Sequence, residues 1–97
     1  MRLEILPHVF PELFLSADWY EIERRGLGAD FLDEAANATE RVGANPLQFP
    51  LTEGDVRRAQ LHRFPFGIFF TYNADVVTVF CIVHLSRDAS VWKKYLP

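Results

Sequence analysis

Cysteine is nearly absent from this sequence, which has one cysteine among its 97 residues. A disulfide framework and a cysteine-based metal site are therefore excluded. The one cysteine, Cys81, lies in the apolar run from Val76 to Val83, and this position predicts a buried and unreactive thiol. The three histidines are far apart along the chain and lack partnering carboxylate motifs, so we expect no metal and no cofactor.

Long apolar runs are missing as well. No stretch approaches the roughly 18 to 20 apolar residues that cross a bilayer, and the first residues lack the apolar stretch of a secretory signal. The chain has no internal repeat, low-complexity tract or linker, and its length is that of one domain. We therefore expect residues 1–97 to form a single cytoplasmic domain without a membrane partner.

Charge is divided unevenly between the two halves of the chain, whose formal net charge is −3. Residues 1–50 hold four arginines and nine acidic residues, a net charge of −5. Residues 51–97 hold six basic and four acidic residues, a net charge of +2. The acidic first half argues against a general coat for nucleic acid, because non-specific binding depends on lysine and arginine meeting phosphates. The basic second half leaves a local anionic target open.

Periodicity predicts two helices in the first half. Pro11 suits the first turn of a helix, and apolar residues recur at helical spacing from there to about Arg25. The triplet Gly26-Leu27-Gly28 is typical of a helix end and a turn. A second amphipathic pattern runs from about Ala29 to Val42 and stops at a glycine, so the two segments predict a helical hairpin.

The first predicted helix has apolar residues on two sides, which is unusual for a surface helix. Leu13, Phe14, Ala17 and Tyr20 fall on one arc, and Leu15, Trp19 and Ile22 fall on nearly the opposite arc. In one interpretation the first arc meets a sheet and the second meets the other helix. In the alternative interpretation Leu15, Trp19 and Ile22 form a surface that binds a partner.

The second half changes from helical to extended periodicity. The segment from Asn45 to Asp55, with two prolines and a glycine, predicts a loop. Val56–Phe64, Gly67–Tyr72 and Val76–Leu85 are rich in β-branched and aromatic residues and predict an antiparallel meander. The third run is apolar on both faces, so we expect it to be central and covered on both sides. With a short strand candidate over residues 1–6, the pattern predicts a two-layer α+β fold.

Four arginines and two histidines are the candidates for chemistry. They are Arg57, Arg58, Arg63, Arg87, His62 and His84. Guanidinium groups grip phosphates or carboxylates and can stabilise charge that develops on phosphorus, while a histidine carries the proton near neutral pH. Arg57 and Arg63 share a face of the first predicted strand. The alternative is that the arginines are solvated or paired with acidic neighbours and that His84 anchors a strand end.

A series of small motifs carries a family resemblance. The motifs are Trp19-Tyr20-Glu21, Gly26-Leu27-Gly28, Phe31-Leu32, Asn45-Pro46, Phe49-Pro50, Arg57-Arg58, Arg63-Phe64-Pro65-Phe66, His84, Arg87 and Trp92. In this order and spacing, over roughly residues 10 to 92, the sequence resembles the RelE/ParE superfamily of toxins from bacterial type II toxin–antitoxin modules. The resemblance implies an N-terminal helical hairpin packed on a twisted antiparallel β-sheet, and a cognate antitoxin as the partner in a toxin–antitoxin hetero-oligomer.

One branch of this superfamily cleaves mRNA in the ribosome. Its strand arginines would map to Arg57 or Arg58 and to Arg63, its late arginine to Arg87, and its terminal tyrosine to Tyr95. The catalytic lysines of that branch have no counterpart, because the only lysines here stand at positions 93 and 94. Either a histidine substitutes for them or the nuclease activity is absent.

The other branch, also described as plasmid-stabilisation proteins, poisons DNA gyrase and is not a nuclease. The motifs that resemble this ParE-like branch more closely are Trp19-Tyr20-Glu21, Gly26-Leu27-Gly28, Asn45-Pro46 and the pair His84 and Arg87. We therefore expect a ParE-like toxin that acts on DNA gyrase, with Leu15, Trp19 and Ile22 as one candidate seat for the antitoxin. The alternatives are a ribosome-dependent mRNA endonuclease and a decayed toxin that only binds its antitoxin.

Overall fold

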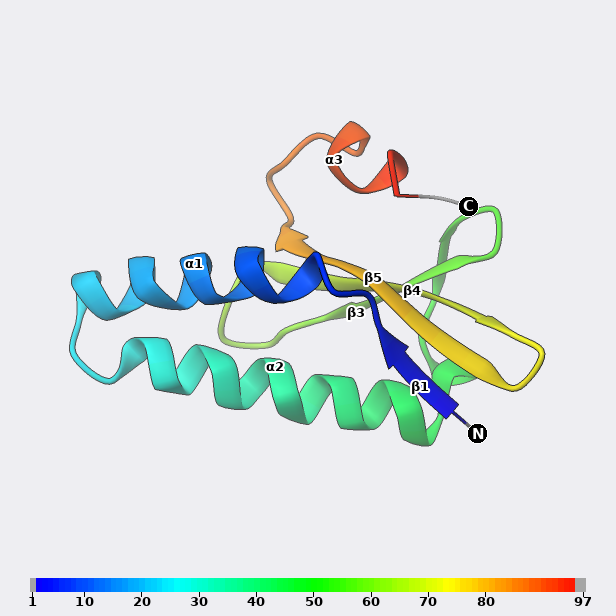
Figure 1. Cartoon of the computed structure of the whole chain (residues 1–97), viewed down its shortest axis with the longest axis horizontal. Helices are drawn as coiled ribbons and strands as arrows, with labels where there is room; N and C mark the ends of the chain where they lie inside the picture. The colour runs from blue at the N-terminus through cyan, green and yellow to red at the C-terminus, as the bar shows by residue number, and fades with distance from the viewer. Residues whose placement is uncertain (1, 96–97) are drawn as a thin grey trace.

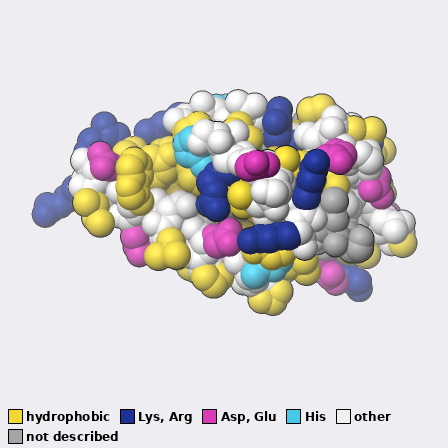
Figure 2. Space-filling view, turned by 90° about the horizontal axis from the view of Figure 1, so that it is seen from above, with side chains coloured by type: hydrophobic (Ala, Val, Ile, Leu, Met, Phe, Trp, Pro, Cys, Tyr) yellow, Lys and Arg dark blue, Asp and Glu magenta, His cyan; other side chains and the backbone are white. Residues whose placement is uncertain are grey.

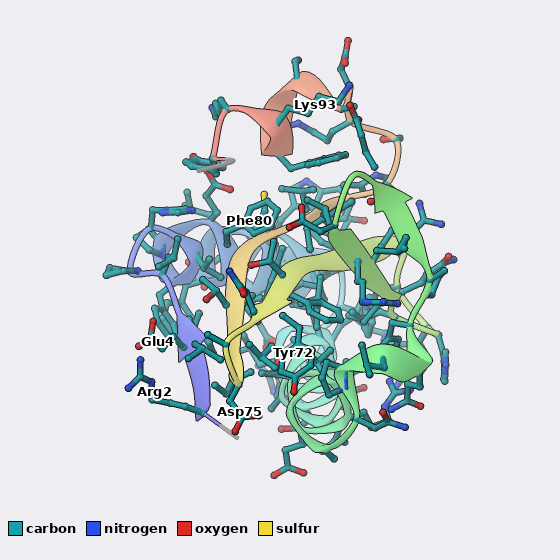
Figure 3. All side chains as sticks on the ribbon, turned by 90° about the vertical axis from the view of Figure 1, so that its right-hand side faces the viewer. Arg2, Glu4, Tyr72, Asp75, Phe80 and Lys93 are labelled. Atoms are coloured by element: carbon teal, nitrogen blue, oxygen red, sulfur yellow. The ribbon has the colours of Figure 1, made fainter. Side chains whose placement is uncertain are left out.

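A computed structural model of the protein describes residues 2–95. Its elements in chain order are β1 (Arg2–Ile5), α1 (Val9–Glu23), α2 (Leu27–Ala44), the 3-10 helix η1 (Pro46–Gln48), β2 (Leu51–Glu53), β3 (Val56–Gln60), β4 (Phe66–Asn73), β5 (Val76–His84) and α3 (Ser90–Lys93). The α+β class is confirmed. The α1–α2 hairpin covers one face of the sheet, and α3 lies over the other face (Figures 1 and 3).

The sheet has five strands in the order β1-β5-β4-β3-β2. Strands β2 to β5 form an antiparallel meander, and β1 lies at the edge, parallel to β5. The short strand indicated over the first residues is thus confirmed, and its direction makes the sheet mixed instead of wholly antiparallel. No helix within residues 2–95 is long and apolar enough to span a membrane.

Strand β5 is buried on both faces, as its apolar pattern predicted. Val77, Val79 and Ile82 face the helical hairpin, whereas Phe80, Cys81 and Val83 face α3. The two cores therefore meet at this strand. Burial raises the pKa of the Cys81 thiol to about 12, which confirms the expected buried thiol and leaves almost no thiolate near neutral pH.

A β-bulge in β5 contacts the turn before α1, and the segment after α3 packs on that turn. Phe80 is the extra residue, because Phe69 pairs with Cys81 while the next residue of β4 pairs with Val79. The carbonyl oxygen of Phe80 lies 2.6 Å from Nε2 of His8, just before α1. The His8 ring stacks on Tyr95, with 4.0 Å between ring centroids. The turn before α1 and the segment after α3 are thus held at the same point of the sheet.

The turn between the two helices has a local polar cause. The carboxylate of Glu21 accepts hydrogen bonds from the amides of Gly26 and Gly28, at 3.0 and 3.1 Å. These amides belong to the first turn of α2, whose N–H groups have no partner within the helix. Gly26 has a φ of +87°, a left-handed conformation that favours glycine. The spacing between Glu21 and the glycine pair is therefore a capping arrangement.

Two segments differ from the sequence-based expectations. Strand β3 was expected to reach Phe64 but ends at Gln60, because Leu61 turns inward, is buried under the hairpin, and donates its amide to the carbonyl of Phe66 at 2.9 Å. The predicted loop after α2 contains the short strand β2, whose residues are all exposed. Exposure on both faces hides such a strand from a hydrophobicity pattern. Helix α2 also runs past Gly43 to Ala44.

Replacing Gly28 by alanine should destabilise the fold. The new Cβ would lie 2.6 Å from the carbonyl oxygen of Ala17, so the helix backbones would have to move apart. A loss of about 1–3 kcal/mol in the free energy of unfolding is expected from such overpacking. Guanidinium chloride denaturation followed by circular dichroism measures it.

Gly43→Ala is the matched control in the same helix. The nearest atom to its added Cβ is Cδ1 of Leu3 at 3.9 Å, an ordinary contact. Because alanine favours helix more than glycine does, this substitution should raise the free energy of unfolding by about 0.5–1 kcal/mol. If both substitutions stabilise the protein, the close contact at Gly28 is not limiting.

Candidate functional site

The second apolar arc of α1 is exposed. Leu15, Trp19 and Ile22 have 69%, 59% and 84% of their surface accessible, respectively. Both the sheet and α2 pack on the other side of the helix, where Leu13, Ala17 and Tyr20 lie. The interpretation in which the second helix covers this arc is therefore wrong. The three residues form a surface that is available to a partner, and we call them the α1 stripe.

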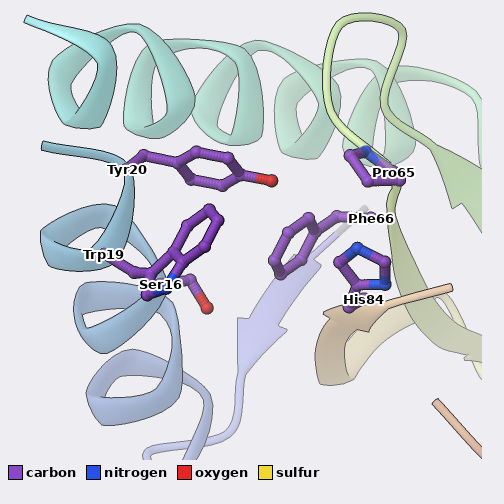
Figure 4. A pocket seen from close by; sticks show the side chains of 6 residues that line it. All are labelled: Ser16, Trp19, Tyr20, Pro65, Phe66 and His84. Carbon is purple, nitrogen blue, oxygen red and sulfur yellow. The ribbon is translucent and has the colours of Figure 1, made fainter. Parts of the chain in front are cut away.

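A groove runs between the α1 stripe on one side and the start of β4 and the end of β5 on the other. One cavity of about 510 Å³ is lined by Ser16, Trp19 and Tyr20 on the side of α1 and by Pro65, Phe66 and His84 on the other side (Figure 4). An adjoining cavity of about 230 Å³ shares Ser16, Phe66 and His84 and adds Glu12, Leu15 and Arg87 among its lining residues. We call the two together the α1–β5 groove.

Aromatic packing forms the base of this groove. Tyr20 lies against Phe31 and Phe64, with ring centroids 5.2 and 4.8 Å away, and Phe66 packs on Phe31 at 4.8 Å. Edge and tilted contacts of this kind stabilise aromatic clusters beyond their buried area. Burial raises the pKa of the Tyr20 phenol, so this group stays neutral and polar within a mostly apolar groove.

His84 lies at the end of β5 and is held in one tautomer. Its Nδ1 accepts the amide hydrogen of Ser86 at 3.1 Å and lies 2.7 Å from the Ser86 hydroxyl oxygen. Because a backbone amide can only donate, Nδ1 is the acceptor, and the neutral ring carries its hydrogen on Nε2. The ring also makes a T-shaped contact with Phe66, with 5.3 Å between the ring centroids. His84 therefore presents a fixed donor beside the α1–β5 groove.

Two of the predicted arginines converge on a cleft next to His84. This cleft, of about 240 Å³, is lined by Arg58, Arg87, His84, Thr52 and Trp92 together with apolar residues of β4, β5 and the segment after it. Within residues 2–95, neither guanidinium group takes part in an ion pair or a side-chain hydrogen bond. We call it the two-arginine cleft, and paired guanidinium groups suit a phosphate or a carboxylate.

The other predicted arginines have protein partners. Arg57 lies on the hairpin side of the sheet and donates to the carbonyl of Phe49 at 2.6 Å. Arg63 lies in the loop after β3 and pairs with Asp30 at 3.4 Å, an exposed contact that stabilises little. The expected shared strand face of Arg57 and Arg63 is wrong, because the strand ends before Arg63.

The remaining candidates lie outside the cleft. His62 is exposed in the same loop, and its amide donates to the carboxylate of Glu34. Trp92 is buried and stacks on Phe69 with 4.8 Å between ring centroids, so it covers the second core. Tyr95 stacks on His8 and does not line the two-arginine cleft. The α3 side presents basic side chains interspersed with acidic ones, without one continuous basic surface (Figure 2).

Three residues to which the sequence assigned no role position this site, although Glu21 belongs to one of the motifs. Glu21 caps α2, Ser86 orients His84, and Glu34 holds the loop that carries Pro65. Glu34 accepts hydrogen bonds from the amides of both His62 and Arg63. No local pattern reveals this role, since the acceptor and its donors are 28 and 29 residues apart. Within residues 2–95, no group of acidic, histidine or cysteine side chains is placed to hold a metal.

The arrangement of elements has a counterpart among solved structures. The structure aligns with a chain of the "Chromosomal ParDE TA system from P. aeruginosa" with a TM-score of 0.77, covering 88% of this chain and 96% of that chain. The fold is ParE-like. Sequence identity over the alignment is 17%, so the ParE-like fold is shown while no residue role is carried across. No protein-family model and no curated protein matches the sequence.

Replacing Glu34 by glutamine should weaken the loop between β3 and β4. A carboxylate accepts both amides, whereas a neutral amide oxygen accepts more weakly. We expect a loss of about 1–2 kcal/mol in the free energy of unfolding, measured by urea denaturation. The neighbouring Asp33→Asn is the control, because Asp33 is exposed and should change stability by less than about 0.5 kcal/mol. Equal losses for both variants would show that Glu34 contributes only its charge.

Proposed function

We propose that residues 1–97 form a single ParE-like toxin domain of a type II toxin–antitoxin module, located in the cytoplasm. A cognate antitoxin neutralises it within a hetero-oligomer, and DNA gyrase is its target. The ParE-like fold supports this assignment. The observation that carries it is the α1–β5 groove, because one wall holds Leu15 and Trp19 of the exposed α1 stripe and the other holds His84 and Arg87.

The groove suits an amphipathic helix from the antitoxin. Helix-in-groove recognition uses apolar anchors at helical spacing, and the α1 stripe offers Leu15, Trp19 and Ile22 as the matching surface. Covering each of these side chains contributes about 1.5–3 kcal/mol. This gain offsets the entropy lost when a disordered segment folds on binding. A helix seated there also lies against His84 and Arg87, so the toxin's polar residues are masked directly.

A protein target is favoured over RNA cleavage by the placement of the lysines. Lys93 pairs with Glu53 at 2.9 Å, which leaves its ammonium group tied to β2. The nuclease branch would need lysines on or before the first long strand, and that part of the sequence has none. A toxin that acts by binding gyrase needs no such group.

Purified protein should stabilise the DNA-cleavage complex of gyrase. The measurement is accumulation of linear, protein-linked DNA after adding the toxin to gyrase, supercoiled plasmid and ATP, and it should rise with toxin concentration. The product of the adjacent gene, as antitoxin, should suppress this accumulation. Unchanged gyrase activity at saturating toxin would exclude gyrase as the target.

The role of the α1 stripe is separable from folding. Trp19→Ser removes an exposed side chain, so the variant should fold normally but bind the antitoxin about ten- to hundredfold more weakly. Leu47→Ser is the matched control, because Leu47 is also exposed, at 60%, but lies in η1, away from the groove. Equal antitoxin affinity for the two variants would place the antitoxin elsewhere.

The two-arginine cleft supports a second candidate function, ribosome-dependent cleavage of mRNA. Arg58 and Arg87 would stabilise negative charge on the phosphate, and His84 would move the proton. Of the predicted catalytic set, these three line one cleft, whereas Arg57 and Arg63 have other partners. A decayed toxin that only binds its antitoxin is the remaining alternative.

Primer extension on ribosome-bound mRNA distinguishes these alternatives. If the chain is a nuclease, toxin-dependent cuts appear at the A-site codon, and Arg87→Gln abolishes them because the cleft loses one of its two guanidinium groups. Arg24→Gln, at the exposed hairpin turn, is the control and should cut normally. Absence of cuts excludes the nuclease. Strong expression that does not inhibit cell growth, together with no effect on gyrase, identifies the decayed toxin.

A further inference from the structure

A second apolar surface lies on the opposite flank of α1 from the α1 stripe. Phe10 and Phe14 are both exposed, at 40% and 51%, although helical spacing had placed Phe14 on the same arc as Leu13 and Ala17. Their rings lie 6.4 Å apart along the helix. Phe10 lines a cavity of about 280 Å³ between α1 and α2, which run side by side (Figure 1), and Phe14 adjoins this cavity through its contact with the Phe10 ring. We call this cavity the α1–α2 trough.

The trough is open because α2 supplies small side chains on this flank. Ala35, Ala36 and Thr39 line it from α2, and their side chains are too short to fill the space beside Phe10. Leu13 and Leu32 form a half-buried apolar floor. Aromatic rings left exposed beside an apolar hollow are typical of a docking surface, because a helix that packed only against its own domain would bury them.

The charge around the trough is negative. Glu40 is the one charged residue that lines it. Asp33 lies seven residues before Glu40 on the same flank of α2, and Asp18 lies four residues after Phe14 on α1. All three acidic residues lie outside the ion pairs between described residues, and no lysine or arginine lines the trough. The α1–β5 groove differs, because its wall carries the cationic Arg87 as well as Glu12.

We infer that the α1–α2 trough binds a cationic amphipathic helix of a partner protein. Apolar side chains four residues apart on that helix would pack against Phe10 and Phe14, and its flanking lysines or arginines would face Asp18, Asp33 and Glu40. A second copy of this chain is the poorer occupant. A symmetric pair places the same patch against itself, so the acidic rims would oppose each other.

This surface is separate from the groove of the proposed function and does not depend on it. The two surfaces share α1 but use opposite flanks, with Asp18 and Pro11 on the ridge between them. One partner can therefore occupy the groove while a different helix occupies the trough. The trough carries only an acidic side chain whereas the groove carries Arg87 beside Glu12, so a cationic helix is selected by the trough.

Two synthetic peptides test the inference. Both carry leucines at helical spacing on one face; one has lysines on its flanks and the other has glutamates at the same positions. Fluorescence anisotropy with the full chain should show binding of the lysine peptide that weakens as NaCl is added, and much weaker binding of the glutamate peptide. Equal binding of the two peptides would overturn the inference.

Variants locate the binding. Phe14→Ser should weaken the lysine peptide roughly ten- to hundredfold, because one exposed aromatic anchor is lost. Glu40→Lys should weaken the lysine peptide and strengthen the glutamate peptide. Leu47→Ser should change neither affinity, and circular dichroism confirms that each variant is folded.

Loss of binding in Trp19→Ser but not in Phe14→Ser would assign the peptide to the α1–β5 groove. Dimerisation of the chain that Phe14→Ser abolishes would make a second copy the occupant, and either result overturns the inference.

Discussion

The contact between α1 and α2 at Gly28 determines which parts of α1 are left exposed. Glycine lets the two backbones approach closely, and the carboxylate of Glu21 holds the turn in place. The sheet and α2 then share one side of α1, so the helix can bury only the arc that contains Ala17. An apolar helix with a single buried arc must expose its remaining apolar residues. The α1 stripe and the α1–α2 trough are both consequences of this geometry.

Polar partners decide which arginines are available. A guanidinium group that has found a carbonyl or a carboxylate is less free to bind a ligand, because binding would first break that contact. Arg57 is held in this way by the carbonyl of Phe49, whereas Arg63 has only an exposed pair with Asp30 and lies in the loop outside the cleft. Arg58 and Arg87 share the two-arginine cleft with His84. The groove and the cleft meet at His84, which lines both. A partner helix in the groove would therefore also control access to the cleft.

The sheet illustrates where pattern reading succeeds. The run that became β5 is apolar at every position except Thr78 and the terminal His84. Its burial on both faces therefore followed from composition. The helical hairpin followed from periodicity and from the Gly26-Leu27-Gly28 turn. The short strand β2 is exposed throughout and forms only because its backbone pairs with β3. The loop after the early end of β3 is bound by Glu34 in α2, which comes from a distant part of the chain.

The sequence by itself determined the α+β class, the helical hairpin, the buried Cys81 and the likeness to ParE-like toxins, because these depend on composition, periodicity and the order of local motifs. It also identified Leu15, Trp19 and Ile22 as an arc distinct from the core. Only the tertiary structure decided that this arc is exposed, that β1 pairs in parallel with β5, and that Arg58 joins Arg87 while Arg57 does not. Exposure and pairing depend on residues far apart along the chain, and a local pattern carries no information about which of them fold together.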